Sequence, residues 1–136
     1  MIETAVRSIA RTTIRSFRDL EVYQEGFRLA MEIFKLTKSF PREELYALTQ
    51  QMRNASRSIP ANIAEGWAKR RYVMVFKRQL LDAIGSANEM VVWLDMAKEC
   101  GYLKIPEHES FLQAYQSLGR RLHQLLTTWK TFHEPE

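Results

Sequence analysis

The stretch Gln50-Gln-Met-Arg-Asn-Ala-Ser-Arg-Ser-Ile-Pro-Ala-Asn-Ile-Ala-Glu-Gly66 decides the fold of this chain. In it and just before it, apolar residues recur at the period of one helix face: Leu45, Leu48, Met52, Ala55, Ile59 and Ile63. A second row at helical spacing is polar or charged throughout: Gln51, Asn54, Ser58, Asn62, Glu65 and Lys69. Pro60 cannot donate to the carbonyl of Ser56, costs about 3 kcal/mol inside a helix, and is expected to bend it. Because the helix keeps such a defect beside an unbroken polar row, we predict that this part of its surface makes a specific contact.

Two helices are predicted in the first half of the chain. The first spans about residues 19–40, with Asp19 as its N-cap. It carries two neighbouring apolar stripes, a wider face than a single seam in a bundle requires. Pro41 and the two acidic residues after it suit a first helical turn, so the second helix is predicted over about 42–67.

Two further helices are predicted in the second half. The third spans about 73–100, with Gly101 as its stop, and the fourth spans about 106–133. Their apolar residues repeat in alternating steps of three and four. Short breaks between long helices predict an all-α fold, an antiparallel up-down four-helix bundle of residues 17–136 behind a short N-terminal extension, residues 1–16.

Charge and composition narrow the class of protein. The chain has 136 residues, a net charge of +4 and 46% hydrophobic residues, which indicates one folded basic domain. The positive excess lies in residues 1–16 and 41–71, while the remaining segments balance or are slightly acidic. We found neither an apolar run long enough for a bilayer nor a secretory signal. The lone Cys100 fits a reducing cytoplasm and is expected to pack near a helix end.

Catalytic and metal-binding patterns are missing from the sequence. The histidines, at 108, 123 and 133, form no close helical ligand pair, and His123 is expected to be a structural histidine near the core of the fourth helix. A Gly-rich phosphate loop and a nucleophile elbow are both missing. The sequence therefore predicts neither an enzyme nor a cofactor.

The polar row has three possible roles. Its side chains can bond across to Ser86, Asn88 or Glu89 on the third helix, form a joint between subunits, or meet RNA with Arg53 and Arg57 on phosphates. Two aromatic residues flank the basic turn at 69–71 and leave the choice open. Trp67 can stack on a base or close the core of the second helix, and Tyr72 can stack as well.

Several blocks in order resemble a known family. They are Phe17-Arg-Asp-Leu20, Phe40-Pro41, Glu43-Glu44-Leu-Tyr-x-Leu-Thr-x-Gln51, Ser58-Ile-Pro-x-Asn-Ile-Ala-Glu-Gly66, Gly85-Ser86 with Glu89, and Gly101-Tyr-Leu103. This pattern resembles the four-helix-bundle proteins encoded in intervening sequences of bacterial 23S rRNA genes and in many other loci. That family is similar in fold to accessory proteins of diversity-generating retroelements, which form ring-shaped homopentamers and bind nucleic acid and a reverse transcriptase. The resemblance implies a small cytoplasmic bundle of unknown physiological role that self-associates as a pentamer and binds RNA.

Two features depart from the family pattern. Members often open the third helix with Ser or Thr, whereas Arg71-Tyr72-Val73 offers no such cap. The N-terminal extension lies outside the resemblance. Its Arg7, Arg11 and Arg15 share a helical face and predict either a basic arm that orders on nucleic acid or a terminus without a role.

We therefore expect a non-catalytic homo-oligomeric bundle that binds nucleic acid. The predicted phosphate contacts are Arg53, Arg57, Lys69, Arg70, Arg71, Lys77 and Arg78. The predicted structural or interface residues are Gln51, Ser58, Pro60, Asn62, Glu65, Gly66, Gly85, Ser86 and Glu89. The alternative is a protein–protein adaptor in which the polar motif serves oligomerisation alone.

Overall fold

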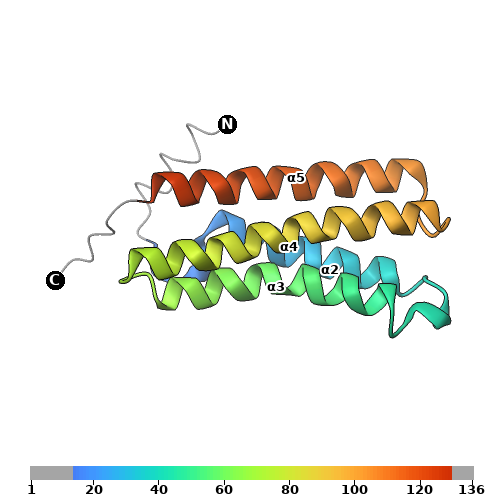
Figure 1. Cartoon of the computed structure of the whole chain (residues 1–136), viewed down its shortest axis with the longest axis horizontal. Coiled ribbons are helices and arrows are strands. Elements are labelled where there is room, and N and C mark those ends of the chain that lie inside the picture. Colours follow the sequence, from blue (N-terminus) through green and yellow to red (C-terminus); the bar gives the residue numbers. More distant parts are fainter. Residues whose placement is uncertain (1–13, 130–136) are drawn as a thin grey trace.

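The structure, a computed structural model, describes residues 14–129. Its elements are η1 (Phe17–Asp19), α2 (Glu21–Thr37), η2 (Arg42–Glu44), α3 (Leu48–Ala68), α4 (Val73–Glu99) and α5 (Ile105–Thr128). The α-helices run side by side and alternate in direction, joined by short connections (Figure 1). The prediction of an all-α antiparallel four-helix bundle is confirmed. The predictions for Arg7, Arg11 and His133 lie outside the described residues.

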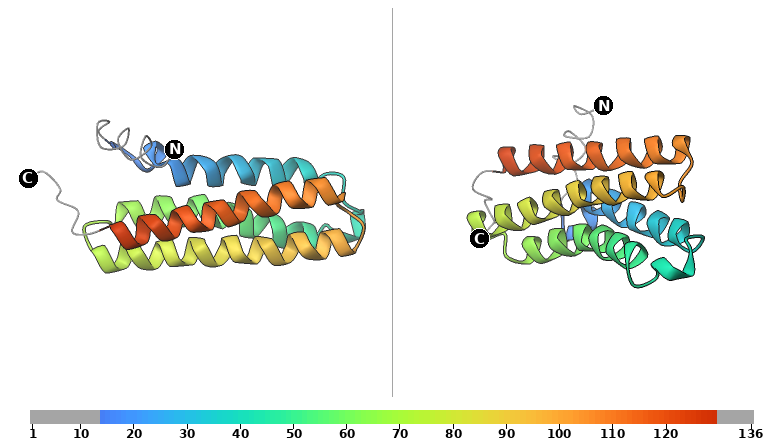
Figure 2. Two further views of the ribbon diagram at one scale, coloured as in Figure 1. Left: turned by 90° about the horizontal axis from the view of Figure 1, so that it is seen from above. Right: turned by 45° about the vertical axis from the view of Figure 1, so that its right-hand side comes forward.

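Helices that follow one another in sequence also pack against one another. In the described part of the chain α2 lies against α3, α3 against α4 and α4 against α5, whereas the backbones of α2 and α4 do not approach closely, nor do those of α3 and α5. These two pairs therefore lie on the diagonals of the bundle (Figure 2). The bundle closes between α2 and α5, where the packing is sparsest.

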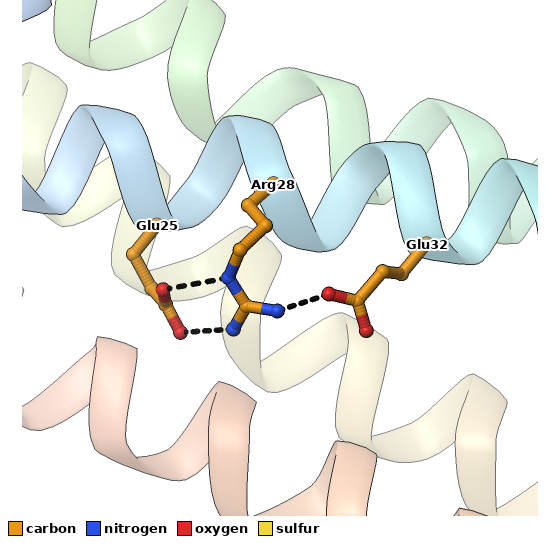
Figure 3. Close-up of polar contacts among 3 residues, drawn as sticks. All are labelled: Glu25, Arg28 and Glu32. Carbon is orange, nitrogen blue, oxygen red and sulfur yellow. Dashed lines mark hydrogen bonds and ion pairs between the residues drawn. The ribbon is translucent and has the colours of Figure 1, made fainter.

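A charged group lies on α2 at this sparse seam. Arg28 donates to both carboxylate oxygens of Glu25, through Nη2 at 2.8 Å and Nε at 3.1 Å, and its Nη1 donates to Glu32 (Figure 3). The hydrogen bonding of Arg28 to the Glu25 carboxylate is the main cause that raises the pKa of Arg28. Behind it on α5, the Tyr115 ring is buried, and burial raises the pKa of its hydroxyl. These ion pairs lie within α2; across the seam, Arg121 Nη2 on α5 donates to Glu21 Oε2 on α2 at 3.2 Å, and the buried ring of Tyr115 contributes to the core.

The buried core follows the predicted helical rows. On α3 the buried apolar side chains include Leu48, Met52, Ala55, Ile59, Ile63 and Trp67; on α4 they are Phe76, Leu80, Ala83, Ala87, Met90, Leu94 and Ala97. On α5 they are Tyr115, Leu118 and Leu122. Leu45, predicted at the head of the α3 row, is 41% exposed because it precedes the helix.

The first helix begins later than predicted. Asp19 is not its N-cap but the last residue of η1, and α2 starts at Glu21. Ser16 caps η1, while Asp19 accepts hydrogen bonds from the backbone N–H groups of Arg15 at 2.8 Å and Ser16 at 3.1 Å. These bonds stabilise the ionised carboxylate and lower the pKa of Asp19. The capping residue was therefore identified in the wrong position.

The second helix also begins later than predicted. Residues 42–44 form only the 3-10 turn η2, and α3 starts at Leu48. A tertiary contact explains the delay. Glu44 accepts hydrogen bonds from Tyr102 Oη at 2.8 Å and from the Leu48 N–H at 3.2 Å, so this side chain joins the loop at 102 to the start of α3.

Pro60 lies inside α3 without breaking it. Its ring is buried, and α2 passes close by at Gly26, where an added Cβ would lie 3.0 Å from Ile59 Cγ2 and 3.6 Å from Pro60 Cδ. The absence of a side chain at Gly26 lets the two helices approach where the proline ring needs room. The bend at Pro60 stays a prediction.

The fourth helix ends earlier than predicted, at Thr128. Trp129 follows it and packs against Phe76 and Trp67, with ring centroids 4.7 Å and 5.9 Å apart. Two expectations about side chains were wrong. His123 and Cys100 are both exposed.

The buried histidine of the described chain is instead His108. Its Nε2 lies 2.7 Å from Asp95 Oδ1 and so joins the start of α5 to α4. His108 lies seven residues before Tyr115, on the same face of α5, but the predicted apolar stripe began only at Phe111 and the burial of this polar residue was not predicted.

Candidate nucleic-acid interface

The polar row of α3 runs along its seam with α4. Ser58 Oγ and Ser86 Oγ lie 2.5 Å apart across the seam. One turn further, Gln79 Nε2 donates to Asn62 Oδ1 at 2.7 Å, and Asn62 Nδ2 donates to the Ser58 carbonyl at 2.8 Å. Ser58 and Asn62 therefore bind α4 within one chain. Their side-chain oxygens are already engaged there.

The other members of the row are more exposed. Gln51 and Asn54 face solvent. Glu65 is exposed too and lies 3.6 Å from Lys69, whose Nζ also donates to Gln79 Oε1 at 3.4 Å. The row is thus structural at its centre and accessible toward its ends.

The predicted partners on α4 were only partly right. Ser86 does contact the row, but Glu89 accepts a hydrogen bond from Trp93 Nε1 on its own helix, and Asn88 lines a groove on the α5 side. Gln79, which was not predicted, supplies the second contact with the row. Its place three residues after the core residue Phe76, on a neighbouring part of the same face of α4, could have indicated that its amide is buried and needs a partner.

The two glycines of the predicted motif differ in their surroundings. A Cβ on Gly66 would lie 2.7 Å from Gln79 Cβ and 3.1 Å from Phe76 Cδ1, so α3 and α4 touch closely here. Gly85 is exposed, and a Cβ on it would meet nothing within 4 Å. Within the described residues, no neighbouring element approaches α4 closely at Gly85.

Arg53 and Arg57 lie on the α2 side of α3, where Phe34 attracts three cations. The Arg53 and Arg57 Cζ atoms are 4.7 Å and 5.8 Å from the Phe34 ring centroid. Lys38 Nζ is 4.8 Å from the same centroid. Arg53 Nε also donates to Thr37 Oγ1 at 2.9 Å, which fixes its direction. We call Lys38, Arg53 and Arg57 the Phe34 cation cluster.

The Phe34 cation cluster carries uncompensated charge. Because each cation lies within 5.8 Å of one ring centroid, no two are further apart than twice that distance. This upper bound is about one and a half Debye lengths at physiological salt, so salt screens part of their mutual repulsion. None of the ion pairs between described residues involves Lys38, Arg53 or Arg57. Lys38 was not predicted because its closeness to α3 comes from the tertiary fold.

The other predicted basic residues gather around the turn between α3 and α4. The Arg70 guanidinium stacks on the Trp67 ring, 4.2 Å from its centroid, and Nη1 donates to the Trp67 carbonyl at 3.0 Å. Trp67 itself is buried, as one of its two predicted roles required, and Tyr72 is exposed. Arg71 is exposed as well. Tyr72, which precedes α4, makes no side-chain cap, as the departure from the family pattern implied.

The predicted basic residues do not form one patch. Lys77, half-buried, and Arg78, exposed, lie in the first turns of α4 beside the basic turn. Arg57 lies thirteen residues before Arg70, about 20 Å along a helix. The structure thus offers two basic regions, the Phe34 cation cluster and the region of the α3–α4 turn.

The described residues contain little else of a chemical site. No three His, Cys, Asp or Glu side chains among them are placed to hold a metal ion. An open groove between α4 and α5 is lined mainly by polar side chains, among them Gln116, Arg120 and His123. Within residues 14–129, no helix is long and apolar enough to cross a membrane.

Fold and site together define a class of protein, a small helical bundle whose distinctive surface is basic and polar. The chain belongs to the 23S rRNA-intervening sequence protein family, whose model matches residues 18–124. A solved structure with the same fold is that of a protein of unknown function from the S23 ribosomal protein family of Bacteroides thetaiotaomicron. It is 24% identical, covers 79% of this chain and 99% of its own, and has a TM-score of 0.72. No curated protein matches the sequence.

Proposed function

We propose that this protein is a non-catalytic, homo-oligomeric, cytoplasmic bundle that binds RNA or other nucleic acid through phosphate contacts. The observation that carries the proposal is the Phe34 cation cluster. Three like charges around one ring, without a carboxylate partner among the described residues, favour an anion from outside the chain. The name of the family supports RNA as the nucleic acid.

The geometry supports phosphate contacts more than base recognition. Lysine and arginine neutralise phosphates regardless of sequence, whereas base recognition needs free amide or hydroxyl groups. The oxygens of Asn62 and Ser58 are used between α3 and α4. We therefore expect affinity with little dependence on base sequence. Repetition of the cluster in an oligomer would add avidity.

The adaptor function is the second candidate. An exposed apolar stripe on α4 favours it, since such a stripe suits contact with another protein. A reverse transcriptase as that partner rests on fold analogy alone. The adaptor needs no nucleic acid, so a binding assay separates the two.

The direct test is fluorescence anisotropy with structured RNA, single-stranded RNA and duplex DNA over a range of salt concentrations. We expect log affinity to fall linearly with log salt. Lys38→Gln with Arg57→Gln removes two cluster charges without removing a side-chain hydrogen bond shown in the structure. This variant should bind more weakly and lower the slope by about 0.7–0.9 for each phosphate that it no longer neutralises.

A matched control removes the same charge elsewhere. Lys104→Gln with Arg120→Gln changes two exposed cations. Lys104 directly precedes α5 and Arg120 lies within it, and α5 is diagonally opposite α3 in the bundle. It should keep most of the affinity and the slope. Equal losses of affinity in both double variants would show that net charge, not the cluster, drives binding. Absence of binding to all three nucleic acids would leave the adaptor.

A further inference from the structure

The connection from α3 to α4 is rich in basic side chains. Residues 68–78 hold five of them and no acidic side chain: Lys69, Arg70, Arg71, Lys77 and Arg78. None of the ion pairs between described residues involves Arg71, Lys77 or Arg78. This end of the bundle therefore attracts anions, as the Phe34 cation cluster does further along α3.

An exposed aromatic ring lies within this basic segment. Tyr72, the residue after Arg71, is 66% exposed, and Met74 is 75% exposed. Among the exposed large apolar residues of the described chain, only Tyr46 is more exposed than these two. Burial of the Tyr72 ring therefore contributes little to the stability of the fold, and the ring is open to a ligand.

The backbone holds Tyr72 in a fixed place. Its N–H donates to the Lys69 carbonyl at 2.9 Å, and its carbonyl accepts from the N–H groups of Val75 at 2.9 Å and Phe76 at 3.0 Å. Phe76 is fully buried and packs edge-on against Trp67. The open ring is thus attached to a backbone that is tied to the core. Ordering it on a ligand costs less conformational entropy than ordering a mobile loop.

An open ring beside a cation suits a nucleotide whose base is unpaired. The base can stack on the ring, because every base has a π-face, while the phosphate meets a basic side chain. Arg71 and Tyr72 are consecutive, so their Cα atoms are about 3.8 Å apart and the two side chains can serve one nucleotide. A base within a duplex is already stacked and paired, so it is not available to the ring.

The other strongly exposed tyrosine has different surroundings. Tyr46, 84% exposed, lies before α3, at the opposite end of that helix. Its nearest charged neighbours in the sequence are Glu44 and Glu43, which repel phosphate. Of the two tyrosines, Tyr72 alone has a cation as its direct neighbour.

We propose that Tyr72 and Arg71 form a stacking site for an unpaired nucleotide, with the adjoining phosphates on other basic side chains of residues 68–78. This inference rests on the proposed nucleic-acid binding and adds the kind of nucleic acid, a strand with unpaired bases. Because stacking tolerates every base, the site selects the pairing state of the strand and not its sequence. The Phe34 cation cluster contributes phosphate contacts only.

Affinity for matched nucleic acids tests the ring. Tyr72→Leu should weaken binding to a single-stranded RNA of about 12 nucleotides by at least about fivefold, the lower end of what stacking on one base contributes. Its affinity for an RNA duplex, and for a strand of equal length without bases, should equal that of the parent. Tyr72→Phe keeps the ring and should bind every probe as the parent does. Tyr46→Leu, the control, should bind as the parent does too.

Salt dependence separates stacking from charge. Tyr72→Leu removes no charge, so it should lower the affinity equally at each salt concentration and leave the slope of log affinity against log salt unchanged. Arg71→Gln should instead lower that slope by about 0.7, the value for one phosphate of a single strand. Both side chains are exposed, so the circular dichroism of both variants should match that of the parent.

Photo-cross-linking gives a measurement on the unaltered protein. Iodouracil in the strand links, on irradiation, to an aromatic side chain on which it stacks, and mass spectrometry identifies the linked peptide. The link should form at Tyr72 and not at Tyr46.

The outcomes separate this inference from the proposed function. An affinity for the single strand that is unchanged in Tyr72→Leu, or that falls equally in Tyr46→Leu, would overturn the stacking site and keep the proposed nucleic-acid binding. A parent that binds none of the probes would overturn both.

Discussion

Gly66 and Gln79 touch so closely that a single methyl group between them has no room. A Cβ on residue 66 would lie 2.7 Å from Gln79 Cβ, nearer than real Cβ contacts come. The atom it meets is next to the backbone of α4, so a simple side-chain rotation cannot relieve the clash. At this point the distance between α3 and α4 is set by the absence of a side chain.

Replacing this glycine should therefore destabilise the bundle. Overpacking costs about 1–3 kcal/mol, which exceeds the roughly 0.5–1 kcal/mol that alanine gains over glycine within a helix. We expect Gly66→Ala to lower the free energy of unfolding, as measured by urea denaturation. Gly119→Ala is the control, because an added Cβ there meets nothing within 4 Å and should stabilise. Stabilisation by both changes would contradict the close contact.

Asn62 should contribute more to stability than its neighbours in the polar row. Asn62→Ala leaves Gln79, which is 9% exposed, without its acceptor, and stranding a buried polar group costs about 1–3 kcal/mol. The exposed Asn54 gives the matched control, since Asn54→Ala has the same gain in helix propensity but strands nothing. Glu65→Ala should cost at most about 0.5 kcal/mol, as expected for an exposed pair on a helix surface. Equal stability of all three variants by thermal unfolding would argue against the seam.

The bond between Tyr102 and Glu44 should make stability fall at high pH. The hydrogen bond to Glu44 is the main cause that raises the pKa of Tyr102 from 10.0 to about 12. Between these values the folded chain holds a proton that the unfolded chain has lost, so the contribution is full below pH 10 and disappears as pH rises toward about 12. Tyr102→Phe should show a shallower decline over that window in urea denaturation. An identical pH profile for variant and parent would exclude this role for the bond.

The Phe34 cation cluster should bind small anions as well as nucleic acid. Ligands that bind only the folded state raise the melting temperature by mass action. At constant ionic strength, replacing chloride with phosphate should raise it more for the parent than for Lys38→Gln with Arg57→Gln. Lys104→Gln with Arg120→Gln corrects for the general stabilisation that phosphate gives proteins. The same phosphate effect in all three proteins would mean that the cluster holds no anion.

Helical periodicity predicted the parts of the fold that depend on local pattern. The buried faces of α3, α4 and α5 follow directly from residues such as Met52, Phe76 and Leu118, because burial of one face is what the pattern encodes. The predicted start of α3 was wrong because it depends on a contact that is distant in sequence. Pro41 and its acidic neighbours do suit a helix start, but the Glu44 carboxylate accepts a hydrogen bond from Tyr102, a residue 58 positions away.

The candidate site was less predictable for the same physical reason. Arg53 and Arg57 could be identified from one helix because they lie one turn apart. Lys38 and Phe34 join them only through the packing of α2 on α3, which no spacing within a helix reveals. Gln79 was missed likewise, since its partner Asn62 is on another helix.

The packing of Trp129 on Phe76 and Trp67 has a practical consequence for every assay described above. It brings the end of α5 to the same end of the bundle as η1 and the basic α3–α4 turn. A fluorophore placed on η1 or on the last turn of α5 would therefore lie at the same end of the bundle as Arg71 and would interfere with a charged ligand there.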